Sequence, residues 1–219
     1  MNLRDEAPTR RPLSRELILD TAIAIADAEG VGAVSMRRVG AELGVQAMSL
    51  YNHVESKQDL IDGMAGRLLA GMEIPTAGTI GWKDAIRTVC RSYRALAHAH
   101  PSLFPTIVAR PLGSPESLPP LEAVLSIMIG DGFDADTALA GFAVMASYVA
   151  GFALGEIGSG TESGRGTIAR DHMPSLSLVD DRYPVTAGVL READPDNDRA
   201  FELGLDLLLD GFDRLPRQR

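Results

Sequence analysis

Apolar residues recur every three or four positions along most of this sequence, which is the spacing of one face of an α-helix. Three stripes show it: Leu60, Ile61, Met64, Leu68 and Met72; Trp82, Ile86, Val89, Tyr93 and Leu96; Phe201, Leu205, Leu208, Phe212 and Leu215. Gly- and Pro-rich stretches separate the stripes, and no convincing run of alternating apolar and polar residues indicates a strand. The sequence therefore predicts an all-α fold.

A breaker-rich segment, IPTAGTIG at 74–81, marks the expected domain boundary. Before it we expect a flexible basic arm over 1–13 and a helical domain over 14–73. After it we expect a larger helical domain over 81–219. Within that domain, residues 157–184 combine Gly, Ser, Pro and charge without a period, which predicts a mobile loop.

Composition limits the class of protein. The net charge of −9 argues against broad, non-specific attraction to nucleic acid, although the acid lies mainly outside the first domain. Cys90 is the single cysteine, which excludes an intramolecular disulfide and fits a reducing cytoplasm. The N-terminus has no apolar run, so no secretory signal is expected and the predicted location is cytoplasmic.

One stretch, 137–155, has no formal charge and nearly the length of a membrane-spanning helix. Its flanks are acidic (Asp131, Asp134, Asp136, Glu156) and it is rich in Ala and Gly. We therefore expect a helix buried on all sides in a soluble protein, with no membrane contact.

Capping residues and glycines divide the first domain into a set of short helices. Ser14 can cap a helix to Glu29, Ser35 a second helix that Gly44 ends, and a helix begins near Ser56. A third short helix lies between the last two. A helix, a Gly-containing turn and a second helix form the geometry that places the second helix in the major groove of DNA.

Burial of Val45 and Leu50 beneath this segment leaves an outward set of uncharged side chains: Gln46, Ala47, Ser49, Tyr51, Asn52 and His53. Such groups read base edges without the indiscriminate attraction of Lys. Phosphate contacts are expected from Arg10, Arg11, Arg37, Arg38, Tyr51 and Lys57. Cations at a helix N-terminus oppose the macrodipole, so Arg37 and Arg38 suggest an external anion. The alternative is three helices that merely pack together.

The stretch AEGVGAVSMRRVGAELGVQAMSLYNHVESKQDLIDGMA resembles the DNA-binding domain of the TetR family of transcriptional repressors over about residues 14–65. The shared pattern is a Gly after the first helix, a Ser/Thr-capped helix with Arg, then LGV, LY-x-H and a Lys before Leu. More loosely, ARP at 109–111, DGFDADTALAGF and AFELGLDLLLDGF resemble the tetracycline-repressor subgroup.

The resemblance implies a homodimer that binds a palindromic operator on double-stranded DNA and is released by a small-molecule inducer held in the C-terminal domain. It places Arg37, Ala47, Met48 and Ser49 near bases, and Tyr51, His53 and Lys57 near phosphates. Asn52 lies among these residues and belongs to the candidate surface. The expected coupling between the domains runs through the helix ending near Met72 and the 74–81 segment.

The subgroup's magnesium-binding histidine has no counterpart here. It lies six residues before the proline of the Arg-Pro element; counting back from Pro111 gives Pro105, with Thr106 the best match. His98 and His100 lie out of register, so no metal, cofactor or tetracycline is expected. Ligand contacts are predicted at Phe104, Ile107, Met145, Tyr148 and Phe152. For each of them, plain core packing is the alternative.

Ala143, Ser147, Gly151 and Gly155 are spaced by four, which favours either close packing inside one subunit or helix contact across a dimer with the Phe201–Leu215 stripe. No nucleophile–base pair or phosphate-binding loop is assembled by a motif, so no catalytic residues and no enzyme are expected. A rival interpretation is a small-molecule-binding helical dimer without specific DNA binding, which the acidic balance favours.

Overall fold

The computed structural model describes residues 12–110, 117–158, 182–194 and 196–217. These residues form helices and turns with no strand among them, so the all-α prediction is confirmed. The elements are α1 (Arg15–Glu29), η1 (Val31–Ala33), α2 (Met36–Leu43), α3 (Ala47–Leu50), α4 (Lys57–Ala70), α5 (Trp82–Ala99), α6 (Phe104–Ala109), α7 (Pro119–Gly130), α8 (Ala135–Gly158), α10 (Pro184–Glu192) and α11 (Asn197–Asp213).

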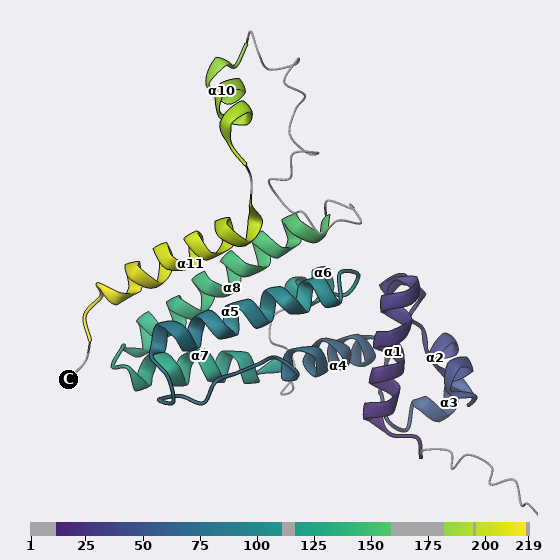
Figure 1. Ribbon diagram of the computed structural model, residues 1–219. Coiled ribbons are helices and arrows are strands. Elements are labelled where there is room, and N and C mark those ends of the chain that lie inside the picture. The colour runs from purple at the N-terminus through teal and green to yellow at the C-terminus, as the bar shows by residue number, and fades with distance from the viewer. Residues whose placement is uncertain (1–11, 111–116, 159–181, 195, 218–219) are drawn as a thin grey trace, which may run out of the picture.

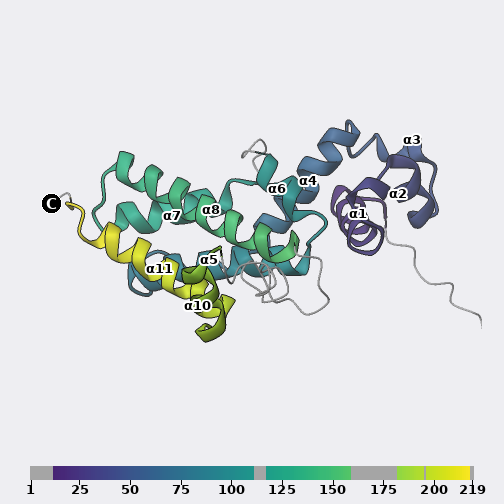
Figure 2. The same cartoon turned by 90° about the horizontal axis from the view of Figure 1, so that it is seen from above.

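Helices α1 to α3 lie together at one end of the molecule, and α4 connects them to a bundle of α5, α6, α7, α8 and α11 (Figure 1). Each group has its own apolar core. Helix α4 contributes to both cores: Leu60 and Met64 are buried with α1, while Leu69 packs with the bundle, as does Met72 just beyond the helix. The view from above shows the same separation (Figure 2).

Side-chain caps fix where several helices begin. Ser14, Ser35 and Ser56 accept hydrogen bonds from backbone amides three residues ahead, at 3.2, 3.2 and 3.1 Å. Asp134 does the same for Thr137 at 2.7 Å. These oxygens satisfy amides that the first turn of a helix leaves free. The caps at Ser14 and Ser35, and a helix start near Ser56, were predicted from the sequence.

The α8 helix departs from the prediction that it is buried on all sides. Met145 and Val149 are buried in the bundle, but Leu139 is 56% exposed and Ser147 also faces out. By length and composition α8 is the one helix among the described residues that could cross a membrane. Here it packs along α5 and α7, which covers one side of it.

The predicted arm and loop lie largely outside the described residues, which omit 1–11 and 159–181. At the edges of the predicted loop, α8 continues to Gly158 and α10 begins at Pro184. The α10 helix was not anticipated. Its proline lies in the first turn, where a missing amide hydrogen costs nothing.

Direct contacts join the two groups of helices at two places. After α5, His100 Nδ1 lies 2.9 Å from a carboxylate oxygen of Asp27 on α1, and Leu103 is buried in the first core. After α6, Arg110 forms an ion pair with Asp62 of α4 and donates to Gln58 Oε1 at 2.8 Å. The 74–81 segment is therefore not the sole physical link between them.

Candidate DNA-binding surface and ligand cavity

The turn between α2 and α3 depends on two glycines. Gly44 ends α2 in the left-handed conformation with a φ of 64°, which glycine adopts without steric cost. The amide of Val45 donates to the carbonyl of Gly40 at 2.8 Å. A Cβ at Gly40 would lie 3.0 Å from the carbonyl oxygen of Val45. The two helices therefore cross in close contact.

Fully buried side chains hold this unit from beneath, among them Val39, Leu50 and Val54. Helix α3 is only one turn long, and Tyr51 to His53 continue it as a turn. Because Leu50 and Val54 anchor both ends of that turn in the core, the remaining side chains are held outward.

The structure places the eight predicted DNA-contacting residues on α2, α3, the turn after it and the start of α4. Met48 is 72% exposed and Tyr51 47% exposed. Three more are exposed, Arg37, Asn52 and Lys57, and three are half-buried, Ala47, Ser49 and His53. An exposed methionine and tyrosine beside small polar groups give contacts for bases and backbone without a strong charge.

Arg38 differs from its neighbour Arg37. Its guanidinium forms ion pairs with Glu29 at 2.6 Å and with Glu42 at 2.7 Å. The hydrogen bond to Glu29 is the largest reason that the pKa of Arg38 is raised, and the same bond lowers the pKa of Glu29. Two carboxylates of the chain already neutralise Arg38, so its place near the start of α2 does not by itself require an external anion.

Arg15 secures the turn between α3 and α4. Its guanidinium donates to both carboxylate oxygens of Asp59, at 2.9 and 2.6 Å, and to the backbone carbonyl of His53 at 3.1 Å. Asp59 also accepts from the amide of Glu55 at 2.8 Å. One arginine on α1 thus fixes the segment that carries His53 and leads to Lys57.

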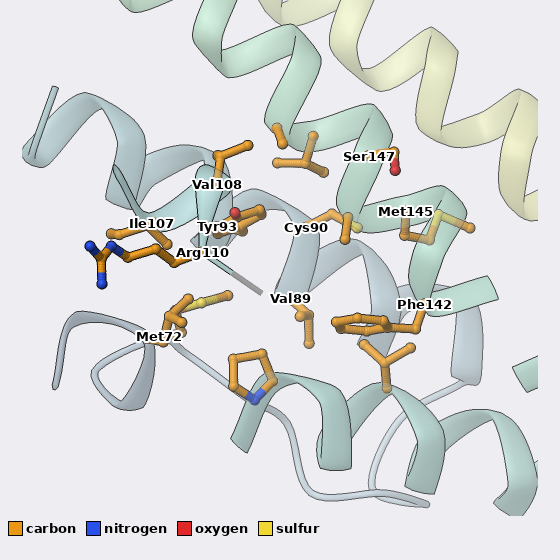
Figure 3. Close-up of a pocket in the computed structure, with 16 residues that line it drawn as sticks. Met72, Val89, Cys90, Tyr93, Ile107, Val108, Arg110, Phe142, Met145 and Ser147 are labelled. Atoms are coloured by element: carbon orange, nitrogen blue, oxygen red, sulfur yellow. The ribbon is translucent and has the colours of Figure 1, made fainter. Parts of the chain in front are cut away.

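A cavity of about 250 Å³ lies between α4, α5, α6, α7 and α8 (Figure 3). The lining residues are Leu69, Met72, Val89, Cys90, Tyr93, Ile107, Val108, Arg110, Pro120, Val124, Phe142, Met145, Ala146, Ser147, Val149 and Ala150. Most of these side chains are apolar or aromatic, the usual lining of a small-molecule site.

Two of the five predicted ligand contacts line this cavity, Ile107 and Met145. Phe104 is fully buried, with its ring centroid 5.1 Å from that of Tyr93. Tyr148 and Phe152 point instead to α11, where both rings contact Phe201 and the Tyr148 hydroxyl donates to its carbonyl at 2.9 Å. Those three residues are absent from the lining.

Sequence reasoning missed several lining residues, of which Phe142, Arg110 and Leu69 come from three different elements. Leu69 lies one position from Leu68 of the predicted stripe. The only available signal was that α4 carries apolar residues on two faces, one for each core. Nothing in the local pattern indicated which face borders a cavity.

Two polar groups of the cavity, Cys90 and Tyr93, are held in their neutral forms. Burial raises the pKa of the Cys90 thiol to about 12 and that of the Tyr93 hydroxyl to about 12. Both groups stay protonated at neutral pH, so Cys90 behaves as a small apolar residue. The Tyr93 hydroxyl is available as a neutral hydrogen-bonding group.

The two histidines at the end of α5 are absent from the cavity lining and have partners elsewhere. His98 Nε2 lies 2.9 Å from a carboxylate oxygen of Glu156, and His100 contacts Asp27. Among the residues the structure describes, no group of three His, Cys, Asp or Glu side chains could hold a metal ion.

Comparison with known proteins matches both parts of the chain. Residues 18–64 match the family described as bacterial regulatory proteins, tetR family. Residues 74–215 match the tetracyclin repressor-like, C-terminal domain. The two matches together cover most of the sequence.

Individual relatives agree with these matches. The HTH-type transcriptional repressor DrrR1 of Streptomyces coeruleorubidus is 34% identical, over 97% of this chain and 83% of the repressor. Tetracycline repressor protein class D of Escherichia coli is 28% identical, over 92% of this chain and 89% of its own length.

A solved structure, Streptomyces coelicolor ActR in complex with actinorhodin, superposes with a TM-score of 0.77 at 27% identity. The superposition covers 92% of this chain and 97% of that one. The helix-turn-helix unit, the helical domain behind it and these relatives lead to one assignment. The chain belongs to the TetR family of bacterial transcriptional regulators, as a ligand-responsive repressor.

Proposed function

We propose that this regulator binds a palindromic operator as a homodimer in the cytoplasm and leaves it when a small molecule fills the cavity. The observation that carries the proposal is the course of α4. Its first residue, Lys57, follows the turn after α3 in the chain, and Leu69 near its other end lines the cavity. A shift of one rigid helix thereby connects the two sites.

The DNA contacts divide by chemistry. Arg37, Ala47, Met48 and Ser49 would approach bases, with Met48 offering an apolar contact for a thymine methyl group. Tyr51, His53 and Lys57 would hold phosphates, and Asn52 lies between the two sets. The exposure of Met48, Tyr51 and Lys57 supports this division.

The outward faces of α8 and α11 form the proposed dimer interface. The Phe201–Leu215 stripe expected there lies on the inward face instead, because Phe201 and Leu205 are buried in the subunit's own core. Two leucines of α11 are strongly exposed, Leu203 at 59% and Leu207 at 68%, and Leu139 and Val144 of α8 are exposed beside small residues. The small residues are Ala143, Ser147 and Gly151. Two such helices from each protomer would form a four-helix interface and cover apolar surface that monomers rarely expose.

The ligand is proposed to be a mainly apolar molecule, held without a metal ion. The structure of ActR with actinorhodin supports a small organic ligand in this fold. A ligand lowers operator affinity by the ratio of its affinities for the two states of the protein. We propose no catalytic role, because the family consists of regulators.

The test is selection of bound fragments from a random DNA pool with the purified protein, followed by a salt titration on the selected sequence. We expect a palindrome with half-sites about one helical turn apart, bound less tightly as salt rises. A folded protein that enriches no sequence would contradict the proposal. It would favour the rival function of a ligand-binding dimer without specific DNA binding, with which the net charge of −9 agrees.

A further inference from the structure

Arg110 has a special position in the cavity. Among the described residues that line it, Arg110 is the one with a charged side chain. In Figure 3 this arginine lies at the edge of the cavity, with its guanidinium directed away from Phe142 and Met145. One end of the cavity therefore carries an arginine, and the rest of the described lining has no formal charge.

The guanidinium has partners on another part of the molecule. It forms an ion pair with Asp62 and donates to Gln58, both on α4. The side chains of Arg110 and Asp62 are 28% and 35% exposed. An ion pair this open to solvent contributes little to stability, so a better partner displaces it readily.

The lining also limits the charge of a ligand. An ionised group placed among apolar side chains needs a counter-charge within reach. The described lining contains no carboxylate, so a cationic ligand would stay unpaired. A carboxylate, sulfonate or phenolate would meet Arg110, whose planar fork binds two oxygens at once.

We propose that the effectors of this protein are apolar, ring-bearing acids, and that their acidic group takes the guanidinium of Arg110 from Asp62. The apolar body lies toward Phe142, and the acid lies at the edge. Loss of the Arg110–Asp62 pair frees α4 from the end of α6. The choice of ligand follows from the cavity alone, whereas the effect on DNA rests on the proposed function.

Two dyes with matched ring systems test the choice of ligand. One is the anionic 1-anilinonaphthalene-8-sulfonate; the other is N-phenyl-1-naphthylamine, which lacks the sulfonate. Both fluoresce in apolar sites, so the affinity of each is measured by titration of the intact protein. For Arg110→Met we expect the anionic dye to bind at least about tenfold more weakly, since a charge-assisted contact is lost. The neutral dye should change less than about threefold.

The second variant, Asp62→Asn, should change the affinity for the anionic dye in the opposite direction. Because it removes the competing carboxylate, it should tighten binding of the anionic dye and leave the neutral dye unchanged. Glu73→Gln is the matched control: it removes the same charge from an exposed residue next to Met72, which lines the cavity. It should change the affinity for the anionic dye much less than Asp62→Asn does.

Three results would overturn the proposal. Arg110→Met could weaken the binding of both dyes equally, or Asp62→Asn could leave the affinity for the anionic dye unchanged. The third is that the dyes still bind to Ala146→Phe, in which the new side chain fills the cavity. On a selected operator, the anionic dye should weaken DNA binding of the wild type but not of Arg110→Met. If no operator is ever selected, the proposed function fails, while the dye titrations still decide the class of ligand.

Discussion

Arg94 of α5 and Glu156 of α8 form an ion pair whose carboxylate is withdrawn from solvent. Arg94 Nε donates to Glu156 Oε2 at 2.8 Å, and the Glu156 side chain has no exposed surface. The hydrogen bond to Glu156 is the largest reason that the pKa of Arg94 is raised. The guanidinium also lies 4.7 Å from the centroid of the Phe201 ring on α11. The pair therefore ties three helices of the bundle together.

We predict that Glu156→Gln lowers the free energy of unfolding by about 1–2 kcal/mol, since it removes a buried carboxylate while Arg94 keeps its second ion pair, with Asp198 at 2.7 Å. The double variant Arg94→Met with Glu156→Leu should recover much of the loss, because an apolar pair needs no counter-charge. Urea unfolding at one fixed protein concentration measures both. A loss below about 0.5 kcal/mol, the range of ordinary surface changes, would contradict the structural role.

A second prediction concerns pH. The hydrogen bonds from Arg15 are the largest cause of the lowered pKa of Asp59. A carboxyl with a lowered folded pKa adds stability above its unfolded pKa of about 3.9. That contribution disappears as the pH falls through the lowered value.

Asp59→Asn should therefore cost about 1 kcal/mol at pH 7, a modest value because the pair is partly exposed. The difference from the wild type should shrink as the pH falls below about 4. Unfolding midpoints from pH 7 to pH 3 measure it. A gap that stays constant with pH would show that the lost contribution is not electrostatic.

The third prediction concerns the close crossing of α2 and α3. Gly40→Val places two methyl groups against the backbone of Val45 and Ala47, so we expect a loss of about 2 kcal/mol or more and weaker DNA binding. Gly188→Val on α10 is the control, because a Cβ there meets nothing within 4 Å. Thermal unfolding compares the stability of the two variants. Equal losses of stability would mean that the lower helix propensity of valine, and not the close crossing, accounts for the effect.

The fourth prediction separates base contacts from phosphate contacts. Tyr51→Ala and Lys57→Ala should weaken binding to every sequence, and Lys57→Ala should reduce the salt slope by about 1. Met48→Ala and Ser49→Ala should instead change which base is preferred. Binding curves on the operator and its single-base variants measure this. If all four variants act alike on all sequences, the division of roles is incorrect.

The first four helices were predictable because their signals are local. Ser35 caps α2, Gly44 ends it, and Leu50 anchors α3, all within 16 residues of sequence. The eight DNA-contacting candidates remain predictions in their roles, but their placement on α2, α3, the turn after α3 and the start of α4 followed from those local signals.

The bundle was less predictable because its contacts are distant in sequence. The sequence showed Glu156 only as an acidic residue at the end of an apolar stretch, because its partner Arg94 lies 62 residues away. The periodicity of α8 identified Tyr148 and Phe152 as inward-facing, but it could not say whether they face α5 or α11. The cavity arises where α4 meets the bundle, a junction that no local pattern describes.

The central claim is that two copies of this chain read two half-sites held about one helical turn apart, ~34–36 Å. The most direct measurement is the affinity for the selected palindrome before and after insertion of five base pairs between its half-sites. That insertion turns one half-site to the opposite face of the duplex. The account predicts a loss of about 100-fold or more, because only one recognition helix then reaches its bases. Unchanged affinity would contradict it, because each subunit would then bind DNA independently of its partner.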